Sequence, residues 1–518
     1  MPGKPVHLGP FKNGLIATND SDPTTIPDFS LSRCVNFDFG QDGALASRPA
    51  IVTEVAPPVA NTRIHPLGVN PYYVRNDGST FLVAACGTQT WLYDIVAKTW
   101  TSIWNQAANG FVQYDNKVVL CSEAGAGGYW EAGTFTATPT MPAGSQIVVY
   151  QERFWIFGAK GTSASTTVYF SKLNVISPPS SIFDWAPTSD FFTVGKGDGQ
   201  WITGLLPDPN ALIIFRSSSS WVFTFPGSPA QGTLRQIDQK IGADNKWCFV
   251  QNENQYYVQS QGFMYQFLNF RFYPLNTKRL EFVPGTISSG SAQFDIRLGV
   301  FANRIILFYR GALWVYSVTT NTWSEWDTAT DAGQFHTIPP TSLTGDSRVA
   351  FAVTASNTGS QQKLLRIAED PIPAGGTGEQ ITAWIRTKAT AVDDASRFKR
   401  MFYWTVEALT AKGVKGAANP VTVVSSSTTW NDMEGFNQDQ FGTWDNPLIV
   451  LPVIVDDVSF PTPSPAHTVT KMIRSMKITR IFFEVYLTFD GTTRTVPAKI
   501  YDLVAYFRES AGVAKKVS

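Results

Sequence analysis

Two stretches of the sequence, WLYDIVAKTW at residues 91–100 and WVYSVTTNTW at residues 314–323, are near copies of each other. Each begins with Trp and Tyr two positions apart and ends with a Thr-Trp pair. Residues two apart share one face of a strand, and a return strand brings the last Trp beside them, so the pattern predicts a β-hairpin with an aromatic face. Recurring hairpins with fixed aromatic positions are typical of a β-propeller, whose blades bury their faces by stacking.

The spacing of the two copies predicts the size of the propeller. They begin 223 residues apart (314 − 91), which at about 40–50 residues per blade is about five blades. Weaker strand–turn–strand patterns fill the interval at residues 147–157, 212–223, 254–265 and 304–314. We therefore expect a β-propeller of about six degenerate blades.

The composition also favours an all-β protein. Of the 518 residues, 43% are hydrophobic, 13% are aromatic and only 16% are charged, and there are 40 Gly and 32 Pro. Long helices would need more charged helix formers, whereas aromatic residues and turn formers suit strands and hairpins. The length is sufficient for more than one domain with its own core.

Changes in the pattern along the chain predict three parts. Residues 1–55 form an N-terminal extended strap and hairpin, with the hairpin at residues 36–49 and a turn or two of helix after Asp28 as N-cap. Residues 56–375 form the propeller, and a Pro/Gly-rich linker lies at residues 369–380. Residues 376–518 form a C-terminal β-sandwich-like domain with longer strands at 381–389, 398–409, 448–455, 468–489 (with a break) and 494–508.

The sequence shows no recognisable active site, and we expect no cofactor and no metal. The four His, at positions 7, 65, 336 and 467, are far apart, and no common catalytic or phosphate-binding motif occurs. Residues 195–199 (GKGDG) precede a strand and are interpreted as a turn. Two carboxylates at residues 19–22 could help to bind Ca²⁺, and an Asx turn explains them as well. The acidic pairs 393–394 and 456–457 are interpreted as solvated loop charge, with a glycosidase pair as the alternative.

Charge, cysteine use and hydropathy restrict the class of partner. The 41 basic and 41 acidic residues balance, which disfavours a groove that grips DNA but permits a surface past which DNA slides. The four cysteines show no C-x-x-C spacing and are interpreted as small apolar filler in a reducing compartment. No stretch reaches the roughly 18 apolar residues of a membrane helix, and the start lacks a signal-peptide core, so we expect neither membrane insertion nor conventional secretion.

The strap resembles the start of bacteriophage tail proteins. The resemblance is greatest to the tail nozzle proteins of short-tailed phages, the tail tubular protein B and packaged-DNA-stabilising group, and it extends to propeller-type minor tail proteins of long-tailed phages. The pattern is carried by Phe11, Gly14, Leu15, Asp22, Ile26, Pro27, Leu31, Asn36, Asp38, Phe39, Gly43, Leu45, Arg48 and Pro49.

The resemblance implies a structural virion protein without catalytic activity. It would be made in the host cytoplasm and would form a homo-oligomeric ring, a hexamer, below the portal and adaptor. The ring would retain packaged DNA, let DNA pass without sequence-specific binding, and carry tail fibre or needle proteins. Residues expected at assembly contacts lie in the strap and in a polar C-terminal loop: Phe11, Gly14, Leu15, Asn36, Phe39, Arg48, Trp430 and Trp444.

Two other functions remain open at this stage. The first is a distal minor tail protein, at a tip or hub, that contacts the host surface. The second is a propeller glycosidase or carbohydrate-binding protein, because the chain has 16 Trp and sugars stack on aromatic rings.

Overall fold

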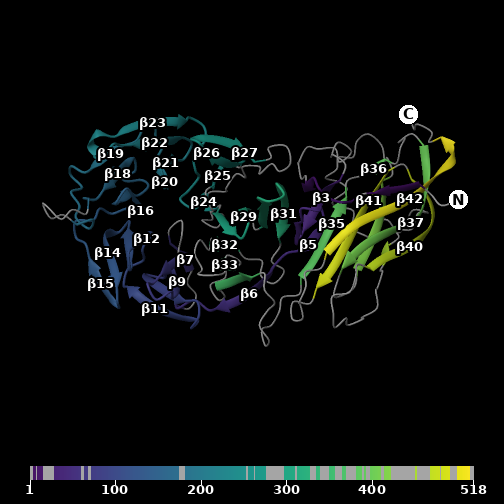
Figure 1. Cartoon of the computed structure of the whole chain (residues 1–518), viewed down its shortest axis with the longest axis horizontal. Helices are drawn as coiled ribbons and strands as arrows, with labels where there is room; N and C mark the ends of the chain where they lie inside the picture. Colours follow the sequence, from purple (N-terminus) through teal and green to yellow (C-terminus); the bar gives the residue numbers. More distant parts are fainter. Residues whose placement is uncertain are drawn as a thin grey trace.

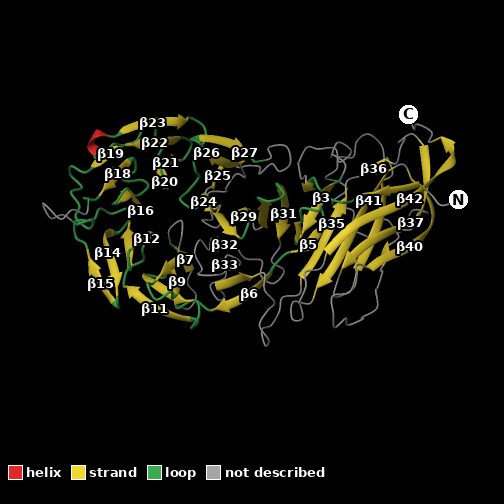
Figure 2. Ribbon diagram, in the orientation of Figure 1, coloured by secondary structure: helices red, strands yellow, loops and turns green. Residues whose placement is uncertain are grey.

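The computed structural model shows an all-β chain with one short helical segment among the described residues (Figures 1 and 2). The structure describes residues 4–7, 9–15, 29–59, 64–67, 72–173, 181–195, 197–252, 255–261, 263–275, 297–309, 312–326, 334–338, 349–355, 364–368, 381–387, 390–391, 397–409, 414–421, 450–451, 467–478, 480–489 and 499–513.

Antiparallel sheets that follow one another along the chain form the propeller (Figure 1). The first contains β7 (Ile64–Pro66) and β8 (Tyr72–Val74), which both pair with β9 (Thr80–Cys86), then β10 (Gln89–Asp94) and β11 (Thr99–Trp104). The second contains β12 (Gly110–Tyr114), β13 (Lys117–Ser122), β14 (Gly125–Glu131) and β15 (Thr134–Ala137). The third contains β16 (Gln146–Tyr150), β17 (Arg153–Phe157), β18 (Thr167–Phe170) and β19 (Phe191–Thr193).

The next sheets repeat this order. The fourth contains β20 (Ile202–Asp208), β21 (Ala211–Arg216), β22 (Ser220–Thr224) and β23 (Thr233–Asp238), with the 3₁₀ helix η1 (Pro229–Gln231) before β23. The fifth contains β24 (Phe249–Asn252), β25 (Gln255–Ser260), β26 (Phe263–Leu268) and β27 (Arg271–Pro274). A further sheet contains β32 (Gln334–Ile338), β33 (Val349–Ala355), β34 (Leu364–Ala368) and, at its outer edge, β6 (Ala50–Val55).

Within the described residues, these six sheets stand as separate blades, which confirms the expectation of about six. One more unit with the same strand order, sixth along the chain, lies between β27 and β32 and contains β28 (Arg297–Phe301), β29 (Arg304–Tyr309), β30 (Ala312–Ser317) and β31 (Thr322–Trp326). Its outer strand continues into an 11-stranded sheet. The pairing of β6 with β34 closes the ring, because a strand from before the first blade completes the last one.

Apolar faces packed between consecutive sheets hold the ring together. The first strands of neighbouring sheets contact one another, as β12 does with β16 and β16 with β20, so these strands lie nearest the axis. The core between the third and fourth blades is built on Trp155, which is fully buried among aromatic and aliphatic side chains. Each blade alone would expose such a face to water, which is why the blades are stable only as a stack.

The repeated hairpins have the predicted structure. In both, the Tyr lies opposite the final Trp across two outer strands, at ring-centroid distances of 4.9 Å for Tyr93–Trp100 and 5.2 Å for Tyr316–Trp323. The residue two before each final Trp, Lys98 or Asn321, has a positive φ of 57° or 56°, which allows the tight turn. The first hairpin belongs to the first blade, and the second belongs to the β28–β31 unit, which is sixth in chain order. The two copies are therefore offset by five units, as their spacing predicted.

The N-terminal strands pair with strands from the end of the chain. In the 11-stranded sheet, β3 (Ser30–Val35) lies between β31 and β35 (Ile381–Thr387), and β2 (Gly14–Leu15) pairs with β3. That sheet continues through β41 (Arg480–Phe489) to β38 (Val414–Val421) and β39 (Val450–Leu451), with β36 (Thr390–Ala391) on β41.

A six-stranded sheet joins the two ends of the chain in the same way. It contains β4 (Phe37–Phe39), β5 (Leu45–Ser47), β42 (Lys499–Val513), β37 (Arg397–Leu409) and β40 (His467–Ile478), and β1 (Lys4–His7) pairs with β42. The hairpin at residues 36–49 is confirmed as β4–β5. The prediction of a helical turn after Asp28 is wrong. Ser30–Val35 is the strand β3, and its pairing on both edges overrides the local N-cap signal. The β-sandwich stays a prediction.

Two further sequence interpretations concern cysteines and membranes. All four cysteines are buried and unbridged, as apolar filler would be. The one helical segment among the described residues, η1, has three residues, so no helix in that part of the chain could cross a bilayer.

Candidate functional site

Asn36, held by Arg48 across the N-terminal hairpin, joins the strap (residues 1–55) to the propeller. Both side chains are 0% exposed, and Arg48 Nε donates to Asn36 Oδ1 at 2.8 Å. The Asn36 backbone N–H donates to the Glu325 carbonyl oxygen of β31 at 2.7 Å, and the Arg48 N–H donates to the Asn36 carbonyl oxygen at 2.9 Å. Asn36 adopts a φ of 62°, a conformation that Asn tolerates better than most residues. The pair therefore fixes the start and the end of the hairpin against the outer strand of a blade.

Asp38, two residues after Asn36, makes further contacts with the same unit of the propeller. Its Oδ2 lies 3.0 Å from Arg304 Nε, and its Oδ1 accepts a hydrogen bond from Trp326 Nε1 at 3.1 Å. Trp326 is 0% exposed, so the carboxylate satisfies a buried donor as well as a cation. One strap side chain thus holds two strands of the β28–β31 unit.

Most of the predicted assembly residues meet in the same joint. Phe11 and Leu15 are 0% and 1% exposed, and Phe39 is 6% exposed. Gly14 has a φ of +71°, and a Cβ there would lie 2.8 Å from Thr322 Cβ, so only glycine fits against β31. These residues pack within one chain, and their use between subunits stays a prediction. Trp430 and Trp444 lie outside the described residues.

Lys246 links three blades of the propeller. It precedes the first strand of the fifth blade, and its Nζ donates to the carbonyl oxygens of Asn109 at 2.7 Å and Ser145 at 3.1 Å. Asn109 and Ser145 directly precede the first strands of the second and third blades. The ammonium group therefore ties blades that are not neighbours in the ring.

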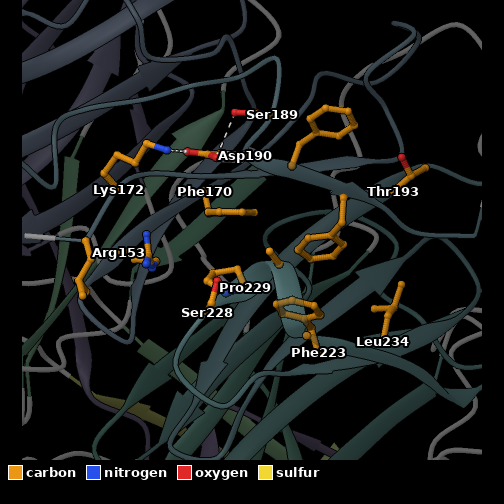
Figure 3. A pocket seen from close by; sticks show the side chains of 15 residues that line it. Arg153, Phe170, Lys172, Ser189, Asp190, Thr193, Phe223, Ser228, Pro229 and Leu234 are labelled. Atoms are coloured by element: carbon orange, nitrogen blue, oxygen red, sulfur yellow. Dashed lines mark hydrogen bonds and ion pairs between the residues drawn. The ribbon is translucent and has the colours of Figure 1, made fainter. Parts of the chain in front are cut away.

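A pocket of about 730 Å³, here called the rim pocket, lies between the outer strands of the third and fourth blades (Figure 3). Its apolar side is formed by Phe170 on β18, Phe192 on β19, Phe223 on β22 and Leu234 on β23. Phe192 and Phe223 stack with centroids 4.2 Å apart and planes at 18°, which joins the two blades at the pocket floor. Phe191, 43% exposed, stands at the pocket edge.

The other side of the rim pocket is charged. Lys172 Nζ and Asp190 Oδ2 form an ion pair at 2.7 Å, and Ser189 Oγ donates to Asp190 Oδ1 at 3.2 Å. Arg153 Nη1 donates to the Ser171 carbonyl oxygen at 2.8 Å. Burial lowers the pKa of Arg153, the Asp190 carboxylate opposes this, and a guanidinium stays protonated at neutral pH. The lining contains one carboxylate, whereas glycoside hydrolysis by the common mechanism uses two.

The other sequence candidates fall in two groups. The GKGDG stretch is a turn, as interpreted, in which Gly195, Gly197 and Gly199 have positive φ and Asp198 pairs with the buried Arg216, Nη1 to Oδ2 at 2.6 Å. The carboxylates at residues 19–22, 393–394 and 456–457 lie outside the described residues. Where the structure is described, it holds no group of three or more His, Cys, Asp or Glu side chains placed to bind a metal.

Sequence reasoning missed Lys246 and the rim pocket. Lys246 stands between Asn245 and Trp247 in a loop, and nothing in that local pattern marks a side chain that reaches two other blades. The pocket combines five strands from two blades, and its one sequence signal is the Phe pair at residues 191–192 next to Asp190. Asp38 belonged to the strap pattern, but its partners Arg304 and Trp326 were not predicted.

Comparisons with known proteins show similarity of fold only. No protein-family model matches the chain, and no curated protein matches its sequence. The computationally designed Ika8 protein is similar over 61% of this chain and 99% of its own, with 11% identity and a TM-score of 0.37. U3-55K is similar over 62% of this chain and 98% of its own, with 9% identity and a TM-score of 0.40. The AfRom2 CNH domain is similar over 61% and 98%, with 7% identity and a TM-score of 0.39. At these values none of them indicates a function.

Proposed function

We propose that this chain is a structural protein of a bacteriophage tail, a nozzle subunit that forms a ring below the portal and adaptor. The ring would line part of the DNA ejection channel and help to retain packaged DNA. It would also carry tail fibre or needle proteins. The proposal includes the strap and a C-terminal β-sandwich as the two parts that attach to the propeller.

The observation that carries the proposal is the strap joint. Among the described residues of the pattern that resembles tail proteins, Asn36 and Asp38 bind the β28–β31 unit of the propeller, and Arg48 holds Asn36 in place. The same strap places β3 between β31 and β35. The N-terminal segment that resembles tail proteins therefore connects the propeller to strands from the C-terminal part of the chain. Such a connection would keep the two parts in a fixed arrangement, as a ring subunit of a DNA channel requires.

The charge balance is compatible with this role. A formal net charge of zero gives DNA little to bind along a channel, so DNA would leave quickly. The rim pocket favours neither alternative function by itself, since it contains a single carboxylate and its aromatic rings pack mainly on one another.

The test is immunogold labelling of this chain on intact phage particles and on particles that have ejected their DNA. Label at the base of the head, in both kinds of particle, is the expected result. Label at the far end of a long tail would replace the nozzle by a tip protein. Particles without label would remove the virion role, and purified protein would then be assayed on host-surface glycans.

A further inference from the structure

The rim pocket has a free strand edge beside it. β19 pairs with β18 through Thr167–Thr193, Val168–Phe192 and Tyr169–Phe191, and among the described residues no strand pairs with its other edge. The Phe170 N–H donates to the Asp190 carbonyl oxygen, and the Val194 N–H donates to that of Thr166. Because hydrogen-bonded and non-hydrogen-bonded pairs alternate in an antiparallel ladder, the backbone groups of Phe191 and Thr193 point away from β18. An extended chain could pair with them.

The charged side of the pocket has an excess of one positive charge. Lys172 and Asp190 neutralise each other at 2.7 Å, which leaves Arg153. Its guanidinium has five donors, and within the described part of the chain the Ser171 carbonyl oxygen accepts from Nη1 alone. A carboxylate is the group that fits the remaining donors best, because it accepts two parallel bonds from a guanidinium.

The apolar side supplies the second contact. Phe192, Phe223 and Leu234 line the same pocket as Arg153. Figure 3 shows the ring of Phe223 and the Leu234 side chain on the side of the pocket away from Arg153 and Lys172. A ligand for this site therefore needs an anionic group and an apolar group on the same face. In an extended peptide, residues two apart share one face.

We propose that the rim pocket binds an extended acidic segment of a partner protein, which adds a strand to the edge of β19. A carboxylate of the segment pairs with Arg153, and an apolar side chain two residues away packs on Phe223 and Leu234. Backbone hydrogen bonds from the segment to Phe191 and Thr193 fix the orientation of the segment along β19. This site does not depend on the proposed virion role, since it would serve any protein that recruits a partner.

The test uses the purified full chain and a set of fluorescein-labelled hexapeptides in which Glu is followed two positions later by Phe, Tyr, Trp or Leu. Fluorescence anisotropy should show saturable binding for at least one peptide. Arg153→Gln should weaken that binding about tenfold or more, the effect expected when a charge-assisted hydrogen bond is lost. Replacing the peptide's Glu by Gln should weaken binding to the native chain by a similar factor, and should have little further effect on the Arg153→Gln variant.

Arg235 on β23, next to the pocket residue Leu234, provides a matched control for Arg153. Arg235 follows Leu234 on β23, is exposed and does not line the pocket, so Arg235→Gln should bind as the native chain does. Leu234→Glu should abolish binding, and thermal melting should confirm that each variant folds. The proposal is overturned if no peptide binds with a Kd below about 1 mM, because weaker binding than this is negligible as recognition. Equal weakening of peptide binding by Arg153→Gln and Arg235→Gln would overturn it too. So would a result in which no peptide binds but the chain self-associates and Leu234→Glu removes that self-association, because the pocket would then bind a second copy of the chain.

Discussion

Replacing Asp38 by Ala should release the strap from the propeller. The Asp38 side chain is 12% exposed and that of Arg304 is 20% exposed, so both groups are largely shielded from water. The substitution leaves the buried Trp326 Nε1–H without its acceptor, which costs about 1–3 kcal/mol, and removes a charged hydrogen bond of about 1.5–3 kcal/mol. Because Arg304 regains some water, we expect a total loss of about 3 kcal/mol in the free energy of unfolding.

Urea denaturation followed by tryptophan fluorescence measures this loss, since many of the 16 Trp are distributed through the blades and report on global unfolding. Asp38→Asn keeps an acceptor for Trp326 and loses only the charge opposite Arg304, so its loss should be about 1–2 kcal/mol. The control is Asp115→Asn, a carboxylate 68% exposed and 3.9 Å from Lys117, which should change stability by less than about 0.5 kcal/mol. If Asp38→Ala is no worse than this control, the joint does not hold the strap and the physical basis of the proposed function is lost.

Three other measurements test features of the ring. Lys246→Met should lower the free energy of unfolding by about 2 kcal/mol in urea, because two carbonyl oxygens near the axis lose a charged donor; an unchanged midpoint would mean that water replaces it. Burial raises the pKa of Cys121 to about 12, so iodoacetamide at about pH 8 should leave the four buried thiols of the folded chain intact and alkylate all four in urea, as read by mass spectrometry. The hydrogen bond from Arg216 lowers the pKa of Asp198 from its ordinary value, so this pair stabilises the fold at neutral pH and the contribution is lost as the pH falls through the lowered pKa. Asp198→Asn should therefore melt at a lower temperature than the native chain at pH 7, and the difference between the two melting temperatures should shrink as the solution is made acidic.

Local patterns predicted the blades well because each blade is a local structure. Tyr93 and Trp100, or Tyr316 and Trp323, are close in sequence and meet across one turn, so alternation and turn residues suffice to predict their pairing. The strap pattern likewise identified Asn36 and Arg48, which pair across one hairpin.

Contacts between distant segments could not be predicted in this way. Nothing in Ala50–Val55 indicates that its partner is β34, because an alternating strand accepts many partners and only closure of the ring selects one. The same holds for β3. Asp28 and the serines that follow it are local signals for a helix N-terminus, but the segment pairs with β31 on one edge and β35 on the other. The rim pocket depends on how two blades lean together, and residues 153, 190 and 234 share no local pattern.

The pairing of early strands with late ones has a consequence for synthesis on the ribosome. β1 needs β42, β3 needs β31 and β35, and β6 needs β34, so the first strands to be made are among the last to find partners. The blades from β7 onward can stack as they emerge, while the strap waits unpaired and exposes strand edges that could pair wrongly. The chain can therefore close only after β42 has been made, and slowing synthesis of residues 499–513 should lengthen the period in which it is open to aggregation.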